Sequence, residues 1–222
     1  MNRPAVASEA LGSFMLFATV IGSGIMAQRL AGGNVAIALF CNTLATGAIL
    51  FVLIAMLAPV SGAHFNPAVT LVMRLRGHIG SGTAAIYVVS QLAGGIAGVW
   101  IAHLMFAEPV LQLSEKLRGG PGQMISEGVA TFGLLLTILG TAKTRPGCVP
   151  ASVALYITAA YWFTASTSFA NPAITIARSL SDSFAGIAPA SVPAFIIAQL
   201  GGAIAAYLIC ETIFTDAPGQ TA

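Results

Sequence analysis

One short polar motif occurs twice within otherwise apolar sequence. It comprises Asn66, Pro67 and Ala68 in the first half of the chain and Asn171, Pro172 and Ala173 in the second. Asn is a preferred N-cap and Pro is favoured at the first helical position, so each copy predicts the start of a helix. Within a bilayer, irregular backbone is tolerated only where it is buried in protein or lines a water-filled cavity. Two copies therefore indicate two half-helices that meet at a solute path, whereas a single Asn-Pro pair usually marks a turn.

The composition places this motif in a membrane. The 222 residues are 57% hydrophobic and only 7% charged, against about 25% charged in soluble domains. The formal net charge of +2 gives no basic surface for nucleic acid. Cys41, Cys148 and Cys210 are widely separated and have no metal-ligand spacing. We therefore expect an integral membrane protein that binds no nucleic acid, metal or cofactor.

The hydropathy pattern predicts an all-α membrane protein with six transmembrane helices and two re-entrant half-helices. A helix needs about 20 apolar residues to cross a bilayer. Segments of that kind lie at residues 8–27, 34–58, 80–104, 124–142, 150–167 and 191–214. The segments that contain the motifs, 62–76 and 168–181, are too short and too polar to cross, so we interpret them as re-entrant half-helices.

The two halves of the chain repeat one pattern. A Gln-Leu sequence followed by Gly and Ala residues begins at Gln91 after the first motif and at Gln199 after the second, and Glu9 and Glu127 open the first helix of each half. Three crossings are an odd number, so the second copy must enter the membrane from the opposite side. We therefore expect one channel domain made of two inverted repeats, residues 1–112 and 122–222.

The basic residues predict the orientation. Arg74, Arg76, Lys143 and Arg145 lie on short connections on the side of the termini, and short connections are the ones that the positive-inside rule counts. We expect both termini to be cytoplasmic.

The whole chain resembles the aquaporin, or major intrinsic protein, family. The resemblance rests on the run Ser-Gly-Ala-His-Phe-Asn-Pro-Ala-Val-Thr (61–70), the six spans, the inverted halves and a Glu in the first helix of each half. It implies the aquaporin fold, with side-chain donors from Asn66 and Asn171 at mid-pore that orient each water, and helix dipoles that repel cations. It also implies a homotetramer with one pore per subunit.

The resemblance assigns supporting roles to three further residues. Glu9 and Glu127 match buried carboxylates that accept hydrogen bonds from the re-entrant loops, because a carboxylate within a span needs such partners. The alternative is that each lies at a helix end and faces water. His64 matches a histidine with a structural or gating role.

The family's filter is built from four positions at fixed offsets from the two motifs. These offsets lead to Thr46, Ala159, Ser168 and Ile174. Water-selective members carry Phe, His and Arg where this chain has Thr46, Ala159 and Ile174. The substitutions predict a wider and less polar constriction that lacks the filter Arg, which leaves its charge selectivity open.

Arg178 could replace part of the missing charge. It lies four residues after Ile174 and therefore on the same helix face, one turn further out. Arg178 either places positive charge in the outer vestibule or pairs at the surface with Asp182, a further four residues on.

These features favour a passive channel for water and small neutral solutes such as glycerol, urea and metalloid acids. Residues 171–182 resemble a bacterial branch of the family that is linked to arsenical permeation, which adds arsenite and a bacterial inner membrane to the expectations. The alternative is an ion-coupled transporter, but its coupling charges would have to be Glu9, Glu127 and Glu211, all near span ends. The scattered polar residues predict no enzyme.

Overall fold

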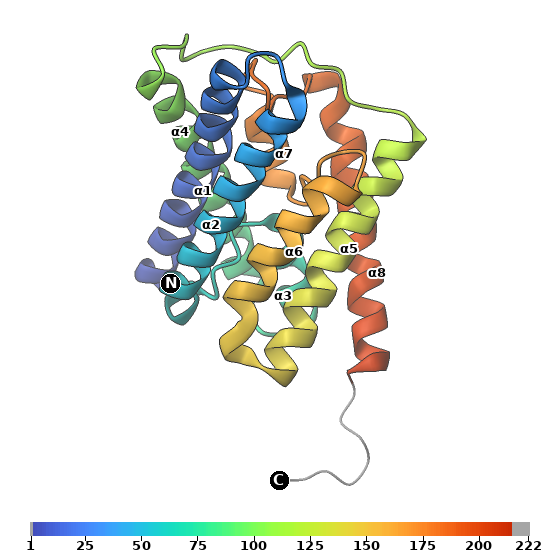
Figure 1. The fold of residues 1–222 in the computed structure, drawn as a ribbon. Helices are drawn as coiled ribbons and strands as arrows, with labels where there is room; N and C mark the ends of the chain where they lie inside the picture. The colour runs from blue at the N-terminus through green and yellow to red at the C-terminus, as the bar shows by residue number, and fades with distance from the viewer. Residues whose placement is uncertain (1, 215–222) are drawn as a thin grey trace, which may run out of the picture.

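The computed structural model describes residues 2–214. The last eight residues of the predicted second repeat, 215–222, lie outside this range. Within it the chain forms eight α-helices and two short 3₁₀ turns, with no strands. The helices are α1 (Arg3–Leu30), α2 (Val35–Ser61), α3 (Pro67–Leu75), α4 (Ser81–Met105), α5 (Pro121–Thr144), α6 (Val149–Phe163), α7 (Pro172–Arg178) and α8 (Val192–Ile213). Figure 1 shows the long helices standing side by side around the short α3 and α7.

Five helices have the length and apolar composition of membrane spans: α1, α2, α4, α5 and α8, the last extended by the turn at Pro189–Ser191. The sixth predicted span, 150–167, is shorter than expected because α6 has 15 residues and ends at Phe163. Thr164 adopts extended backbone, with φ −112° and ψ 137°, and the chain turns toward the second motif at residues 164–166. The protein is an integral, multi-pass membrane protein.

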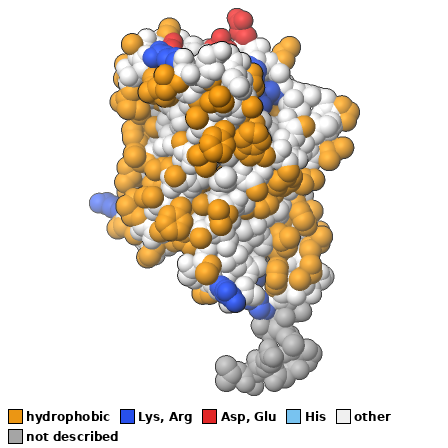
Figure 2. All heavy atoms as spheres, in the orientation of Figure 1, with side chains coloured by type: hydrophobic (Ala, Val, Ile, Leu, Met, Phe, Trp, Pro, Cys, Tyr) orange, Lys and Arg blue, Asp and Glu red, His pale blue; other side chains and the backbone are white. Residues whose placement is uncertain are grey.

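In each half the first long helix packs against the last, α1 against α4 and α5 against α8. The contact between α2 and α6 joins the two halves. Glycine permits the close approach in both halves. A Cβ atom at Gly94 would collide with the carbonyl oxygen of Ala10, and one at Gly202 with that of Gly128. Small residues at such positions let membrane helices bring their backbones together. Figure 2 shows the outer surface of the helix bundle, where hydrophobic side chains spread over the visible face and acidic side chains lie at its upper end.

A candidate pore at the meeting of two half-helices

The segments before the two motifs have the same unusual backbone. Ala63 and Phe65, three residues and one residue before Asn66, have φ values of 50° and 48°. Ser168 and Ala170, at the same offsets before Asn171, have 50° and 48°. The left-handed region is unfavourable for residues with a Cβ and persists only where surrounding contacts hold it. The structure supplies those contacts from α1 and α5.

Glu9 of α1 holds the first loop. Its Oε1 accepts hydrogen bonds from the backbone N–H of His64 (2.9 Å) and the hydroxyl of Ser61 (2.7 Å). Its Oε2 accepts from the N–H of Phe65 (2.8 Å) and from Nε2 of Gln91 (2.8 Å). The carboxyl group is fully buried and does not face water at a helix end. Glu9 thereby joins α1 to the last residue of α2, to the loop and to α4.

Glu127 of α5 holds the second loop in the same way. Its two oxygens accept from the N–H groups of Phe169 (2.9 Å) and Ala170 (3.0 Å), and Nε2 of Gln199 donates to it at 2.6 Å. Glu127 is also fully buried. In the sequence, Gln91 and Gln199 are recognisable only as matching positions of the two repeats. Each amide also donates to a Thr of the neighbouring half-helix, at 3.0 and 2.9 Å.

The two motif asparagines exchange hydrogen bonds between the halves. Nδ2 of Asn66 donates to the carbonyl oxygen of Ala170, and Nδ2 of Asn171 donates to that of Phe65, both at 2.8 Å. Each Oδ1 accepts from the first turn of its own helix, from the N–H of Ala68 (2.9 Å) and of Ala173 (3.0 Å). An amide nitrogen carries two hydrogens. One N–H of each Asn therefore stays available to the cavity that both side chains line.

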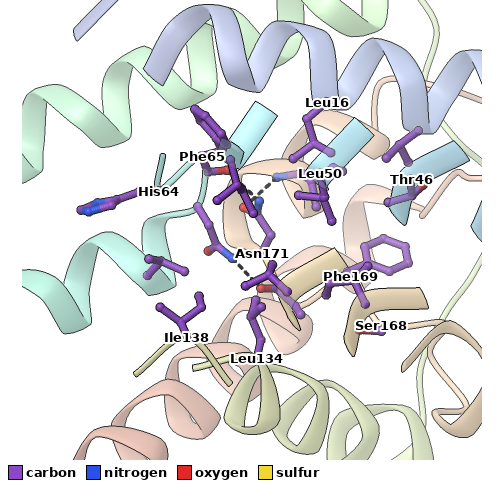
Figure 3. Close-up of a pocket in the computed structure, with 18 of the residues that line it drawn as sticks. Leu16, Thr46, Leu50, His64, Phe65, Leu134, Ile138, Ser168, Phe169 and Asn171 are labelled. Carbon is purple, nitrogen blue, oxygen red and sulfur yellow. Dashed lines mark hydrogen bonds between the residues drawn. The ribbon is translucent and has the colours of Figure 1, made fainter. Parts of the chain in front are cut away.

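A narrow cavity of about 70 Å³ runs past these amides, room for about two water molecules. The structure brings both asparagines, His64, Thr46, Ser168 and Ile174 into its wall, and Figure 3 shows the labelled members of this set grouped with apolar side chains such as Leu16, Leu50 and Leu134. The hydroxyl of Ser168 is buried and has no hydrogen-bond partner in residues 2–214. His64 places Nδ1 3.1 Å from Oγ1 of Thr70, and its ring packs edge-on against Tyr87.

Ala159 does not reach this cavity. It is exposed on α6, whereas Tyr161, two residues further along, is buried and lines the cavity. The hydroxyl of Tyr161 lies 3.3 Å from Oγ1 of Thr46. The offset that led to Ala159 assumed a loop of fixed length between α6 and the second motif. The early end of α6 changes which residue faces inward, and no signal in a single sequence marks Tyr161.

Arg178 lies in the cavity wall and not at the surface. Its side chain is buried, with a residue exposure of 2%, and its Nε donates to the carbonyl oxygen of Ala185. Its Cζ lies 3.4 Å from the centroid of the Phe169 ring. Asp182 instead accepts a hydrogen bond from the backbone N–H of Glu115 at 3.1 Å. The predicted surface pairing of Arg178 with Asp182 is therefore wrong. The cavity is lined by Ile174 and by the guanidinium group of Arg178, one helical turn further along.

Two re-entrant helices that meet at paired amides, inside a ring of membrane-length helices, define a membrane channel. Comparison with known proteins identifies its kind. The profile of the Major intrinsic protein family matches residues 2–168, and the chain belongs to this family. It is a family of channels for water and small solutes and not of enzymes.

Named relatives agree with this assignment. The chain is 54% identical over 217 residues to "Aquaglyceroporin AqpS" of Rhizobium meliloti, an alignment that covers 98% of this chain and 92% of the relative. It is 32% identical to a "Probable aquaporin TIP-type" of Medicago truncatula, over 61% of this chain and 55% of that protein. The X-ray structure of the aquaglyceroporin from Plasmodium falciparum superposes with a TM-score of 0.75, 19% identity and coverage of 96% and 97% of the two chains. This last likeness shows the aquaporin fold.

Proposed function

We propose that the protein is a passive channel for water and small neutral hydroxylated or amide solutes, with glycerol and urea as the first candidates and metalloid acids such as arsenite as further ones. The observation that carries the proposal is the pair of asparagines, each with one N–H bonded across the pore and the other free for a solute oxygen. A passing solute can exchange its hydrogen bonds to water for bonds to these donors. A relative named as an aquaglyceroporin supports the choice of glycerol.

The proposed filter consists of Thr46, Ser168 and Ile174, with Tyr161 in place of Ala159. Its hydroxyl groups suit solutes that carry several hydrogen-bonding groups, and Ile174 supplies an apolar surface for their carbon atoms. Ser168 adds a buried hydroxyl without a protein partner. Arg178 sets positive charge beside these groups, which suits neutral solutes and disfavours cations.

The ion-coupled transporter is not favoured. Coupling requires intramembrane charges that can change their partners. Glu9 and Glu127 are each saturated by hydrogen bonds to a re-entrant loop. Glu211 is half-exposed, with its Oε1 3.6 Å from Nε of Arg76.

We further propose a homotetramer in a bacterial inner membrane, with both termini in the cytoplasm and no catalytic activity. Family membership supports the tetramer, and the rhizobial relative supports the bacterial membrane. The proposed repeats, 1–112 and 122–222, are supported by the matched loops, carboxylates and crossed amides of the two halves.

Stopped-flow light scattering on proteoliposomes tests the channel. Vesicles are shrunk once with an impermeant sugar and once with glycerol or urea. We expect fast shrinkage in sugar and protein-dependent reswelling in glycerol and urea, because the filter passes solutes wider than water. Protein-free vesicles are the control. Fast water flow without reswelling would contradict the solute range, and no flow of either kind would contradict the channel.

A further inference from the structure

A second arginine lies beside Arg178. Arg118 belongs to the connection between α4 and α5, and its Cζ lies 4.9 Å from the centroid of the Phe169 ring, on which Arg178 also stacks at 3.4 Å. The two guanidinium groups are therefore no farther apart than the sum of these distances. Phe169 is itself fixed by Glu127 through its backbone N–H. One ring thus carries two cations next to the cavity.

Backbone carbonyl groups hold both guanidinium groups. Arg118 donates from Nε to Gly186 (2.9 Å) and from Nη1 to Ser166 (3.2 Å), and Arg178 donates to Ala185. Within residues 2–214 the only ion pairs join other residues, so neither guanidinium has a carboxylate partner. Burial lowers the pKa of Arg118 to about 10, against the smaller opposing effects of Glu127 and Tyr161. Arg118 stays charged at neutral pH.

Arg178 is buried and Arg118 is partly buried, and positive charges taken out of water without a counter-ion are unfavourable for folding. Neutral donors could satisfy the same carbonyl oxygens, so holding the loop does not by itself require charge. At the mouth of a membrane pore, by contrast, fixed charge in a low-dielectric wall acts strongly on any ion that enters. Positive charge there repels cations and leaves neutral solutes unaffected.

We propose that Arg118 and Arg178, stacked on the shared ring of Phe169, form a two-arginine barrier that excludes cations from the cavity. The inference rests on the proposed channel function. Arg178 lines the cavity and acts on the permeating solute directly. Arg118 does not line the cavity; it is a positioning residue whose guanidinium lies over the same Phe169 ring and adds its charge to the barrier. The pair supplies the charge that Ile174 does not.

The test compares two solutes of the same shape and different charge, urea and the guanidinium cation. Uptake of each at low millimolar concentration is measured in proteoliposomes, with potassium and valinomycin to balance charge. We expect wild type to admit urea and to exclude guanidinium. Arg178→Gln should raise the guanidinium-to-urea uptake ratio about tenfold, and Arg118→Gln should raise it severalfold, because each removes one charge from the barrier.

Matched variants separate charge from loop anchoring. Arg118→Lys keeps the charge but cannot reproduce the planar pair of donors. If charge forms the barrier, Arg118→Lys should exclude guanidinium as wild type does. If only the anchoring of the loop matters, it should admit guanidinium as Arg118→Gln does. Arg29→Gln, at a surface arginine paired with Glu108 at 2.8 Å, should leave the ratio unchanged. Water permeability of each sample reports intact channels. If a Gln variant loses water permeability, Arg178→Lys is measured in its place, and we expect it to exclude guanidinium as wild type does.

The outcomes distinguish this inference from the proposed function. A wild type without water or urea flow contradicts the channel itself. A wild type that conducts water and urea but admits guanidinium as readily overturns the barrier. So does a set of conducting variants that all keep the wild-type ratio.

Discussion

The Glu127→Ala protein is expected to lose water and solute permeation and to unfold well below the wild-type temperature in detergent. The substitution leaves the N–H groups of Phe169 and Ala170 and the amide of Gln199 without their acceptor in a fully buried site. Each unsatisfied buried group costs about 1–3 kcal/mol, and Ala170 loses the contact that holds its left-handed backbone. Thermal unfolding and stopped-flow water permeability measure the two effects.

Glu108→Ala is the matched control for this loss. Glu108 forms a surface ion pair with Arg29, and such pairs contribute about 0–1 kcal/mol, so its removal should change neither readout appreciably. Glu127→Gln should fall between the two, because it retains one acceptor oxygen. Water flow and thermal stability in Glu127→Ala equal to those of Glu108→Ala would show that the second loop does not depend on the carboxylate.

The second large effect is expected from Ile174→Arg. Ile174 lines a cavity of only about 70 Å³, and an Arg there would extend into it one helical turn from Arg178. We expect glycerol and urea reswelling to fall about tenfold or more, equivalent to about 1.4 kcal/mol in the barrier to passage. Water flow should fall less, because a water molecule needs a narrower path. Stopped-flow light scattering measures all three solutes in one preparation.

Ile174→Leu keeps volume and polarity and should conduct like wild type. If Ile174→Arg reswells in glycerol as fast as Ile174→Leu, position 174 does not limit the solute path. A loss of water and glycerol flow in equal proportion would indicate closure of the cavity and not a change in selectivity.

Sequence reasoning anticipated the parts of the fold that depend on local signals. The Asn-Pro pairs begin α3 and α7 as N-cap and first helical residue, and the apolar runs become long helices. Family membership confirms the aquaporin fold and the channel class. The roles assigned to Asn66, Asn171, Glu9 and Glu127 stay predictions, although their hydrogen bonds join the loops as those roles require.

The remaining features depend on tertiary geometry that no local pattern encodes. The fixed offset from the second motif predicts Ala159 and misses Tyr161, because α6 ends early. The course of the Arg178 side chain depends on the carbonyl of Ala185 and the ring of Phe169. No local pattern places Arg118 beside Phe169, because this proximity arises from the return of the long connection between α4 and α5.

The crossed amides also constrain how the protein can be made. Asn66 and Asn171 each donate a hydrogen bond to a carbonyl oxygen of the opposite half, 104 and 106 positions away along the chain. While the first half is alone in the membrane, the Asn66 amide and the Phe65 carbonyl lack the protein partners that they have in the complete fold. These two bonds at the centre of the pore can form only after the second half is inserted, and they then tie the two halves together.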